Sequence, residues 1–181
     1  MVVSSTTRSN QYNYDYYKDL FTRTTIDEPT GNSLSLNPFG TVVQYYHKGT
    51  GDYTLSTGAI SPSANTAVVY LVEGNLNITG AGDLTIASGK SAAFIVSGKV
   101  TVAASVDTVE GIFIVGGDFD ASSGNTQLSI NGSLYADRFV GGRSIPPNTT
   151  PAYKFTYEPK YLLPLVQYLG KSQVNWQEVA P

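Results

Sequence analysis

The chain contains no cysteine, so it has no disulfide framework, no thiol nucleophile and no cysteine-ligated zinc site. It also lacks a surplus of basic residues, because 11 Lys and Arg stand against 14 Asp and Glu, for a net charge of -3. Without a basic patch to neutralise phosphates, nucleic acid is not an expected partner. Neither a run of about 18 apolar residues nor a signal-peptide pattern is present, so we expect any membrane anchor to lie in a segment outside this chain.

Proline is absent between Pro62 and Pro146, and a short pattern recurs within this stretch. Each copy has two or three apolar residues, a spacer, a glycine, and then alternating apolar and polar residues. The period of two predicts strands with one buried face, and the missing proline leaves every backbone N–H free to pair. The four copies are Tyr70–Ile78, Phe94–Val102, Phe113–Ala121 and Leu128–Ala136, and their glycines are Gly74, Gly98, Gly117 and Gly132.

The spacing of these glycines indicates the architecture. They are 24, 19 and 15 residues apart, which is close to the circumference of one coil of a β-solenoid with variable corners. In such a fold a coil cannot bury its own inner face, so neighbouring coils stack and share one apolar interior. We predict a mainly β, single-stranded β-solenoid of about four to five coils, with the four glycines at corners. A β-sandwich is the alternative, since short strands at regular spacing are also typical of sandwiches.

Aromatic residues crowd the two ends of the chain. Because a stack of coils exposes its interior and its strand edges at both ends, we expect these aromatics to plug the ends. Tyr14, Tyr17 and Phe21 have helical spacing and predict a short N-terminal helix. We predict a single domain, 1–181, made of an N-terminal helix and cap (1–30), a β-solenoid (31–145) and an aromatic C-terminal cap segment (146–181).

The C-terminal cap segment shows three patterns. Residues 153–157 alternate like an edge strand, and 161–169 have the apolar spacing of a helix that begins near Pro164 or is kinked by it. Gly170 is the expected stop of that helix. Val174 and Trp176 then alternate with polar residues in a short strand, in which Trp176 is expected to anchor the cap.

No catalytic motif accompanies the repeat. Asp118 and Asp120 would point to the same side of a strand, and they are weak candidates for calcium ligands or for the carboxylates of a polysaccharide-active enzyme. Asp107, Glu110 and Asp137 are the acids that could join them. His47 has no second histidine with which to share a metal, and we interpret it as a residue beside aromatics. The sequence therefore predicts no catalytic residue, no cofactor and no firm metal site.

Four segments resemble the C-terminal β-solenoid ectodomains of bacterial pilin-like surface proteins, and the likeness covers roughly 66–181. They are Gly111–Phe119, Leu128–Arg138, Tyr157–Leu163 and Trp176–Pro181. The resemblance implies a non-catalytic structural or adhesive module, displayed at the cell surface or on a pilus-like appendage. Its implied partners are other surface or pilus proteins, with glycans as a further candidate.

Two alternatives from other classes stay open. The repeats also resemble bactofilins, which are cytoskeletal polymers of stacked β coils, although this chain has less regular coils and an aromatic tail. A carbohydrate-binding or carbohydrate-active β-helix is the other alternative, because such enzymes often use this type of fold.

Overall fold

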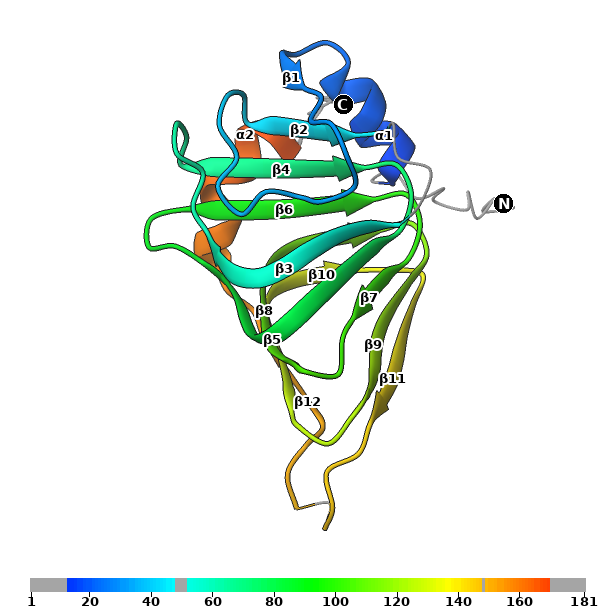
Figure 1. The fold of residues 1–181 in the computed structure, drawn as a ribbon. Helices are drawn as coiled ribbons and strands as arrows, with labels where there is room; N and C mark the ends of the chain where they lie inside the picture. The colour runs from blue at the N-terminus through cyan, green and yellow to red at the C-terminus, as the bar shows by residue number, and fades with distance from the viewer. Residues whose placement is uncertain (1–12, 48–51, 148, 170–181) are drawn as a thin grey trace, which may run out of the picture.

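The computed structural model describes residues 13–47, 52–147 and 149–169, and it shows a β-solenoid of about five turns (Figure 1). All the strand pairs are parallel, as expected when each coil lies on the one before it. The predicted fold class and coil number are therefore confirmed. The strands are β1 (Ile26–Asp27), β2 (Val43–Tyr46), β3 (Tyr53–Ile60), β4 (Ala67–Val72), β5 (Leu76–Ile86), β6 (Ser91–Val96), β7 (Val100–Val102), β8 (Val106–Val115), β9 (Asp118–Gly124), β10 (Leu128–Tyr135), β11 (Arg138–Arg143) and β12 (Tyr153–Thr156).

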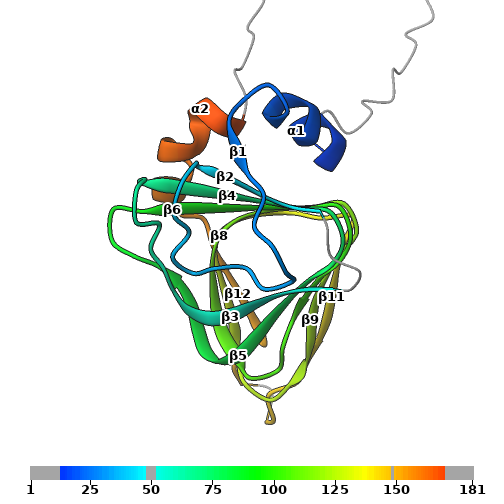
Figure 2. The ribbon, with the colours of Figure 1, turned by 45° about the horizontal axis from the view of Figure 1, so that its top comes forward.

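Viewed along the stack, each coil bends at three corners and so forms three faces (Figure 2). Face A contains β1, β2, β4, β6 and the second halves of β8 and β10. Face B contains the first halves of β3 and β5 with β7, β9 and β11. Face C contains the second halves of β3 and β5, the first halves of β8 and β10, and β12.

The coils become shorter along the chain. Val43 pairs with Val69, 26 residues further on, whereas Ala93 pairs with Ile112 after only 19 residues. Inside the stack, aromatic rings follow one another from coil to coil: Tyr70 stacks on Phe94 at 5.0 Å between ring centroids, and Phe94 on Phe113 at 4.8 Å. Each stacked pair adds about 1 kcal/mol to what its burial alone contributes. The interior is therefore a continuous aromatic and aliphatic core.

The corner prediction is confirmed for three of the four glycines and wrong for the fourth. Gly74, Gly98 and Gly117 lie at the turns from face A to face B. Gly132 instead lies inside β10 and pairs with Gly111 of β8, at the corner between faces C and A. Both residues have positive φ, and a Cβ at Gly132 would overlap the Gly111 carbonyl, so a glycine is required there for a different reason. The residue that continues the first corner is Asp137, whose N–H donates to the Gly117 carbonyl.

The N-terminal helix is confirmed as α1 (Tyr14–Phe21), capped by Asn13, whose side chain accepts from the Tyr16 N–H. The predicted C-terminal helix is interrupted. It consists of two 3-10 turns, η1 (Pro159–Tyr161) and η2 (Leu163–Leu165), followed by α2 (Val166–Leu169). Pro159 and Pro164 each occupy the first turn of such an element, since proline lacks the N–H that a longer helix would need. Gly170, Val174 and Trp176 lie outside the described residues.

The helical segments cover a face of the solenoid and do not plug its ends, which corrects that part of the expectation (Figure 2). Both α1 and the turns η1 and η2 contact β6. The reason is that β4 and β6 are buried at every position, so their outward apolar side chains also need cover. The buried side chains that provide it are Tyr14, Tyr17 and Phe21 of α1 with Tyr161 and Leu165 of the C-terminal turns. Among the described residues, no helix is long and apolar enough to span a membrane.

Candidate functional site

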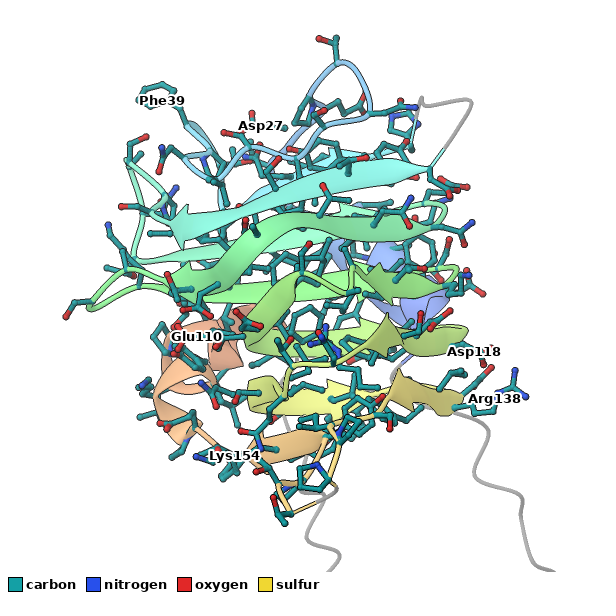
Figure 3. All side chains as sticks on the ribbon, turned by 60° about the horizontal axis from the view of Figure 1, so that its bottom comes forward. Asp27, Phe39, Glu110, Asp118, Arg138 and Lys154 are labelled. Carbon is teal, nitrogen blue, oxygen red and sulfur yellow. The ribbon has the colours of Figure 1, made fainter. Side chains whose placement is uncertain are left out.

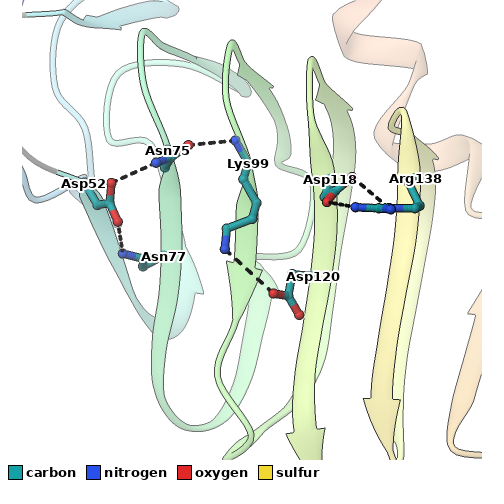
Figure 4. A network of polar contacts seen from close by, with 7 residues as sticks. All are labelled: Asp52, Asn75, Asn77, Lys99, Asp118, Asp120 and Arg138. Atoms are coloured by element: carbon teal, nitrogen blue, oxygen red, sulfur yellow. Dashed lines mark hydrogen bonds and ion pairs between the residues drawn. The ribbon is translucent and has the colours of Figure 1, made fainter.

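The candidate acids Asp118 and Asp120 lie at the start of β9, on the exposed side of face B (Figure 4). Each faces a basic side chain from a neighbouring coil. Arg138 donates to both carboxylate oxygens of Asp118, at 3.2 Å from Nε and 2.7 Å from its terminal nitrogen. Lys99 Nζ lies 3.8 Å from an Asp120 oxygen. The two carboxylates therefore point outward as expected, but each interacts with its own cation.

These contacts belong to a longer ladder of polar side chains that we call the corner ladder: Asp52, Asn75, Lys99, Asp118 and Arg138. Asn75 donates to Asp52 at 2.9 Å, and its amide oxygen accepts from the Lys99 backbone N–H at 2.9 Å. Asn77, one step along face B, also donates to Asp52 at 3.2 Å. Successive coils are thus joined by side chains as well as by backbone pairing (Figure 4).

The charges of the corner ladder are balanced locally. The hydrogen bonds and charge of Arg138 hold the pKa of the Asp118 carboxyl below its usual range. Asn75 and Asn77 do the same for Asp52, whose pKa is also lowered. Both carboxylates are exposed, so these contacts are screened by water and each contributes little to stability. Their main effect is to fix the register of the coils along this corner.

Calcium binding needs six to eight oxygen ligands in typical sites. Within 13–47, 52–147 and 149–169 there is no group of three or more acidic, histidine or cysteine side chains that could hold a metal ion. Asp118 and Asp120 therefore remain a prediction as calcium ligands, and the neighbours that the structure shows for them are cations.

The other candidate acids lie elsewhere on the solenoid. Glu110, on face C, accepts from the Ile86 backbone N–H at 2.8 Å and faces Tyr161, whose pKa is raised mainly by burial. Asp137 lies at the corner after β10, and Asp107 lies near the start of β8. These acids do not converge with Asp118 and Asp120 on one groove.

His47 lies beside aromatics, as the sequence indicated. Its ring stacks on Tyr45 at 4.3 Å between centroids, and its Nε2 is 3.1 Å from a Glu28 carboxylate oxygen. This position is on the outward side of face A, next to α1. Nothing in the described neighbourhood pairs His47 with a nucleophile.

A polar hollow of about 520 Å³ lies at the N-terminal end of the stack. Its floor includes the inward-facing Gln44 and Tyr46, and Phe39 stands at its rim with 80% of its surface exposed. Asp27 is the central polar residue. It accepts from the Thr41 N–H at 2.5 Å, the Thr41 hydroxyl at 3.0 Å and the Gln44 amide at 3.0 Å. These hydrogen bonds, the first of them above all, lower the pKa of Asp27 and close the first coil.

Sequence reasoning missed one buried charge. Arg143, at the end of β11, is only 6% exposed, and no carboxylate is among the acceptors of its guanidinium hydrogen bonds. The guanidinium donates mainly to backbone carbonyls from three coils, and burial lowers its pKa. The acceptors are the carbonyls of Ala103, Val106, Ala121 and Thr126, together with the Thr126 hydroxyl. Arg143 is a structural pin of the corner between faces B and C.

Comparison of the chain with protein-family models, with characterised proteins and with solved structures found no match.

Proposed function

We propose that the chain is a non-catalytic structural or adhesive module that is displayed on the cell surface or on a pilus-like appendage. The observation that supports this most is the corner ladder, in which the most suggestive acids of the chain, Asp118 and Asp120, face Arg138 and Lys99 from adjacent coils. These side chains reinforce the stack and leave no converging carboxylates. An interior filled by stacked rings adds rigidity, which suits a module that has to hold its shape outside the cell.

The carbohydrate-active alternative needs two carboxylates on either side of a bound sugar, about 5 to 10 Å apart, with one of them free to act as acid or base. Asp118 is held by both ends of the Arg138 guanidinium, and Glu110 binds a backbone N–H on another face. This arrangement favours a scaffold over a hydrolytic site. A glycan-cleaving activity of the purified chain that the double change Asp118→Asn and Asp120→Asn abolishes would replace the proposal.

The polymer-forming alternative has one specific observation in its favour, which is that the outer edges of β11 and β12 carry no further strand among the described residues. Continuous growth needs a matching edge at the other end. There, the segment 28–42 lies over the first full coil and contains Pro29 and Pro38. Prolines and irregular backbone are typical of a protected edge.

Surface display can be tested in the organism that makes the protein. Intact cells are treated with a membrane-impermeant amine-reactive label, and the chain is recovered with an antibody. We expect labelling of exposed lysines such as Lys154 without permeabilisation, with a cytoplasmic enzyme as the unlabelled control. A chain that is labelled only after the cells are opened would contradict display.

A further inference from the structure

The outer edge of β12 is an unusual feature of the C-terminal end of the stack (Figure 3). β12 pairs with β10 on one side, and no strand of the described chain lies on its other side. Phe155 is 56% exposed and Tyr157 is 64% exposed, although Phe155 is in register with the buried Ile130 and so points to the interior side. Exposed aromatics on an unpaired edge are typical of an interaction surface.

The backbone of β12 is oriented for a further pairing. The Leu128 N–H donates to the Ala152 carbonyl, so in this parallel ladder Ala152, Lys154 and Thr156 bond toward β10. Phe155 and Tyr157 alternate with them and direct their N–H and C=O groups outward. The chain is still extended at Glu158, where φ is -124° and ψ is 91°. A five-residue edge from Lys154 to Glu158 can therefore receive another strand.

The side chains of this edge are complementary to themselves. If a second copy lies antiparallel with Thr156 opposite Thr156, then Lys154 lies opposite Glu158, and Phe155 lies opposite Tyr157. Each of these pairs occurs twice by symmetry. Opposite charges, aromatic pairs and Thr–Thr pairs are the three kinds of cross-strand contact that stabilise antiparallel sheets. The register also puts Phe155 and Tyr157 in a hydrogen-bonded pair, which matches the direction of their backbone groups.

We propose that the C-terminal end of the solenoid binds a second copy of this chain across a two-fold axis at Thr156. The pairing covers Phe155 and Tyr157 on the interior side and joins Lys154 to Glu158 of the second copy on the exterior side. Because the interface uses the same surface on both copies, the assembly closes as a dimer and does not grow. The inference is independent of where the protein is displayed.

Charge complementarity favours this occupant over the N-terminal end of another copy. Glu158 lies 3.4 Å from Lys160 in its own chain, so the intermolecular pair extends an existing ion pair. In a head-to-tail stack, the edge of β12 on face C would instead meet the segment 35–38, Ser-Leu-Asn-Pro, which offers no acid to Lys154.

The test is a pair of charge reversals, measured by sedimentation over a range of protein concentrations. Lys154→Glu places two carboxylates opposite each other at both ends of the interface, and Glu158→Lys does the same with two cations. We expect each variant alone to weaken the dimer about tenfold or more. An equimolar mixture of the two should form a heterodimer, because every reversed residue then meets an opposite charge. Arg23→Glu, an exposed change at the far end, is the matched control and should leave the dimer unchanged.

A single cysteine gives a second readout that does not depend on charge. The chain has no cysteine, so Thr156→Cys introduces one thiol, and a residue opposite itself in a non-hydrogen-bonded pair lies within disulfide reach. Under a mild oxidant, we expect this variant to form a covalent dimer and Thr101→Cys, on face B, to remain monomeric. A wild-type chain that is monomeric up to its solubility limit would overturn the proposal. So would a dimer that both charge reversals leave intact.

Discussion

The two ends of the solenoid solve the same problem differently. At the N-terminal end, the segment 28–42 folds back over the first coil, buries Leu34 and leaves a polar hollow around Asp27. At the C-terminal end, the last strands present Phe155 and Tyr157 to solvent. Both ends close the same apolar interior, so the difference does not come from the core. It shows that one end is completed within the chain, whereas the other has the properties of a contact surface.

The interior supports of the two ends differ as well. Near the C-terminal end, Arg143 links three coils through carbonyl groups. Near the N-terminal end, Asp27 links the first strand to Thr41 and Gln44. One is a buried cation among neutral acceptors, and the other is a partly exposed anion among neutral donors. The predictions below use this contrast, beginning with the side chain that holds more groups.

Replacing Arg143 with Ala should have the largest effect. The change removes the donors of four carbonyl groups at a buried corner, and unpaired buried acceptors are costly. We expect the free energy of unfolding to fall by about 3 kcal/mol, measured by urea denaturation. Arg143→Lys keeps the charge but not the planar set of donors, so its loss should be intermediate. Hydrogen exchange should increase around β9 and β11 and stay unchanged in β2. A uniform increase along the whole stack would contradict a local role for Arg143.

The sequence predicted the coils better than it predicted what surrounds them. The spacing from Gly74 to Gly98 to Gly117 follows one corner, so the circumference could be read from it. Gly132 was misplaced because a glycine flanked by alternating residues also occurs at the next corner, where Gly111 and Gly132 pair. Aligning those two glycines with each other would have given the correct phase. It would also have put Arg138 beside Asp118, as the structure does.

Two other features were harder to predict, for different reasons. The runs Ala67–Val72 and Ser91–Val96 do not alternate with polar residues, and this is a sequence signal that both faces of the strands are buried. It pointed to helices over face A, although the aromatic ends were assigned to the ends of the stack. Arg143 gave no such signal, because its acceptors are mainly backbone carbonyls, which every residue has. A partner of that kind can be found only in the folded chain.

Asp27→Asn should have a smaller effect, confined to the N-terminal end. The substitution keeps the size of the side chain but weakens hydrogen bonds to a charged acceptor, so we expect a loss of about 1 kcal/mol. The pKa of Asp27 is lowered in the folded chain, so its contribution is present above the unfolded pKa and is lost as the pH falls through the folded pKa. Stability should therefore decline in acid for the wild type, and the decline should be shallower for Asp27→Asn.

The control for this prediction is a carboxylate that interacts with a cation at the opposite end of the stack. Asp118→Asn removes the contact with the exposed Arg138, and its effect should appear in β9 and β11. Hydrogen exchange of β2 and of 28–42 distinguishes the two variants. Equal exchange of this region in both variants would mean that Asp27 does not close the first coil.

The smallest effect is expected at the contact between α1 and the stack. Glu73 accepts from the Tyr45 hydroxyl at 2.7 Å and lies 3.2 Å from Lys18 Nζ, and the Tyr45 hydrogen bond above all lowers its pKa. Because the carboxylate is partly exposed, Glu73→Gln should cost only about 0.5 kcal/mol. The lowered pKa means that this contribution is present above the unfolded pKa and is lost as the pH falls through the folded pKa.

Salt distinguishes this contact from the apolar cover beneath it. The Lys18 to Glu73 pair is partly exposed, so the difference between wild type and Glu73→Gln should shrink in high salt. Tyr17 and Phe21 are buried against face A, and Phe21→Ala should cost more, about 3 kcal/mol, with little dependence on salt. Chemical denaturation with urea at two ionic strengths measures both. If Glu73→Gln cost as much as Phe21→Ala, the helix would be held by its polar contact and not by the burial of its aromatic face.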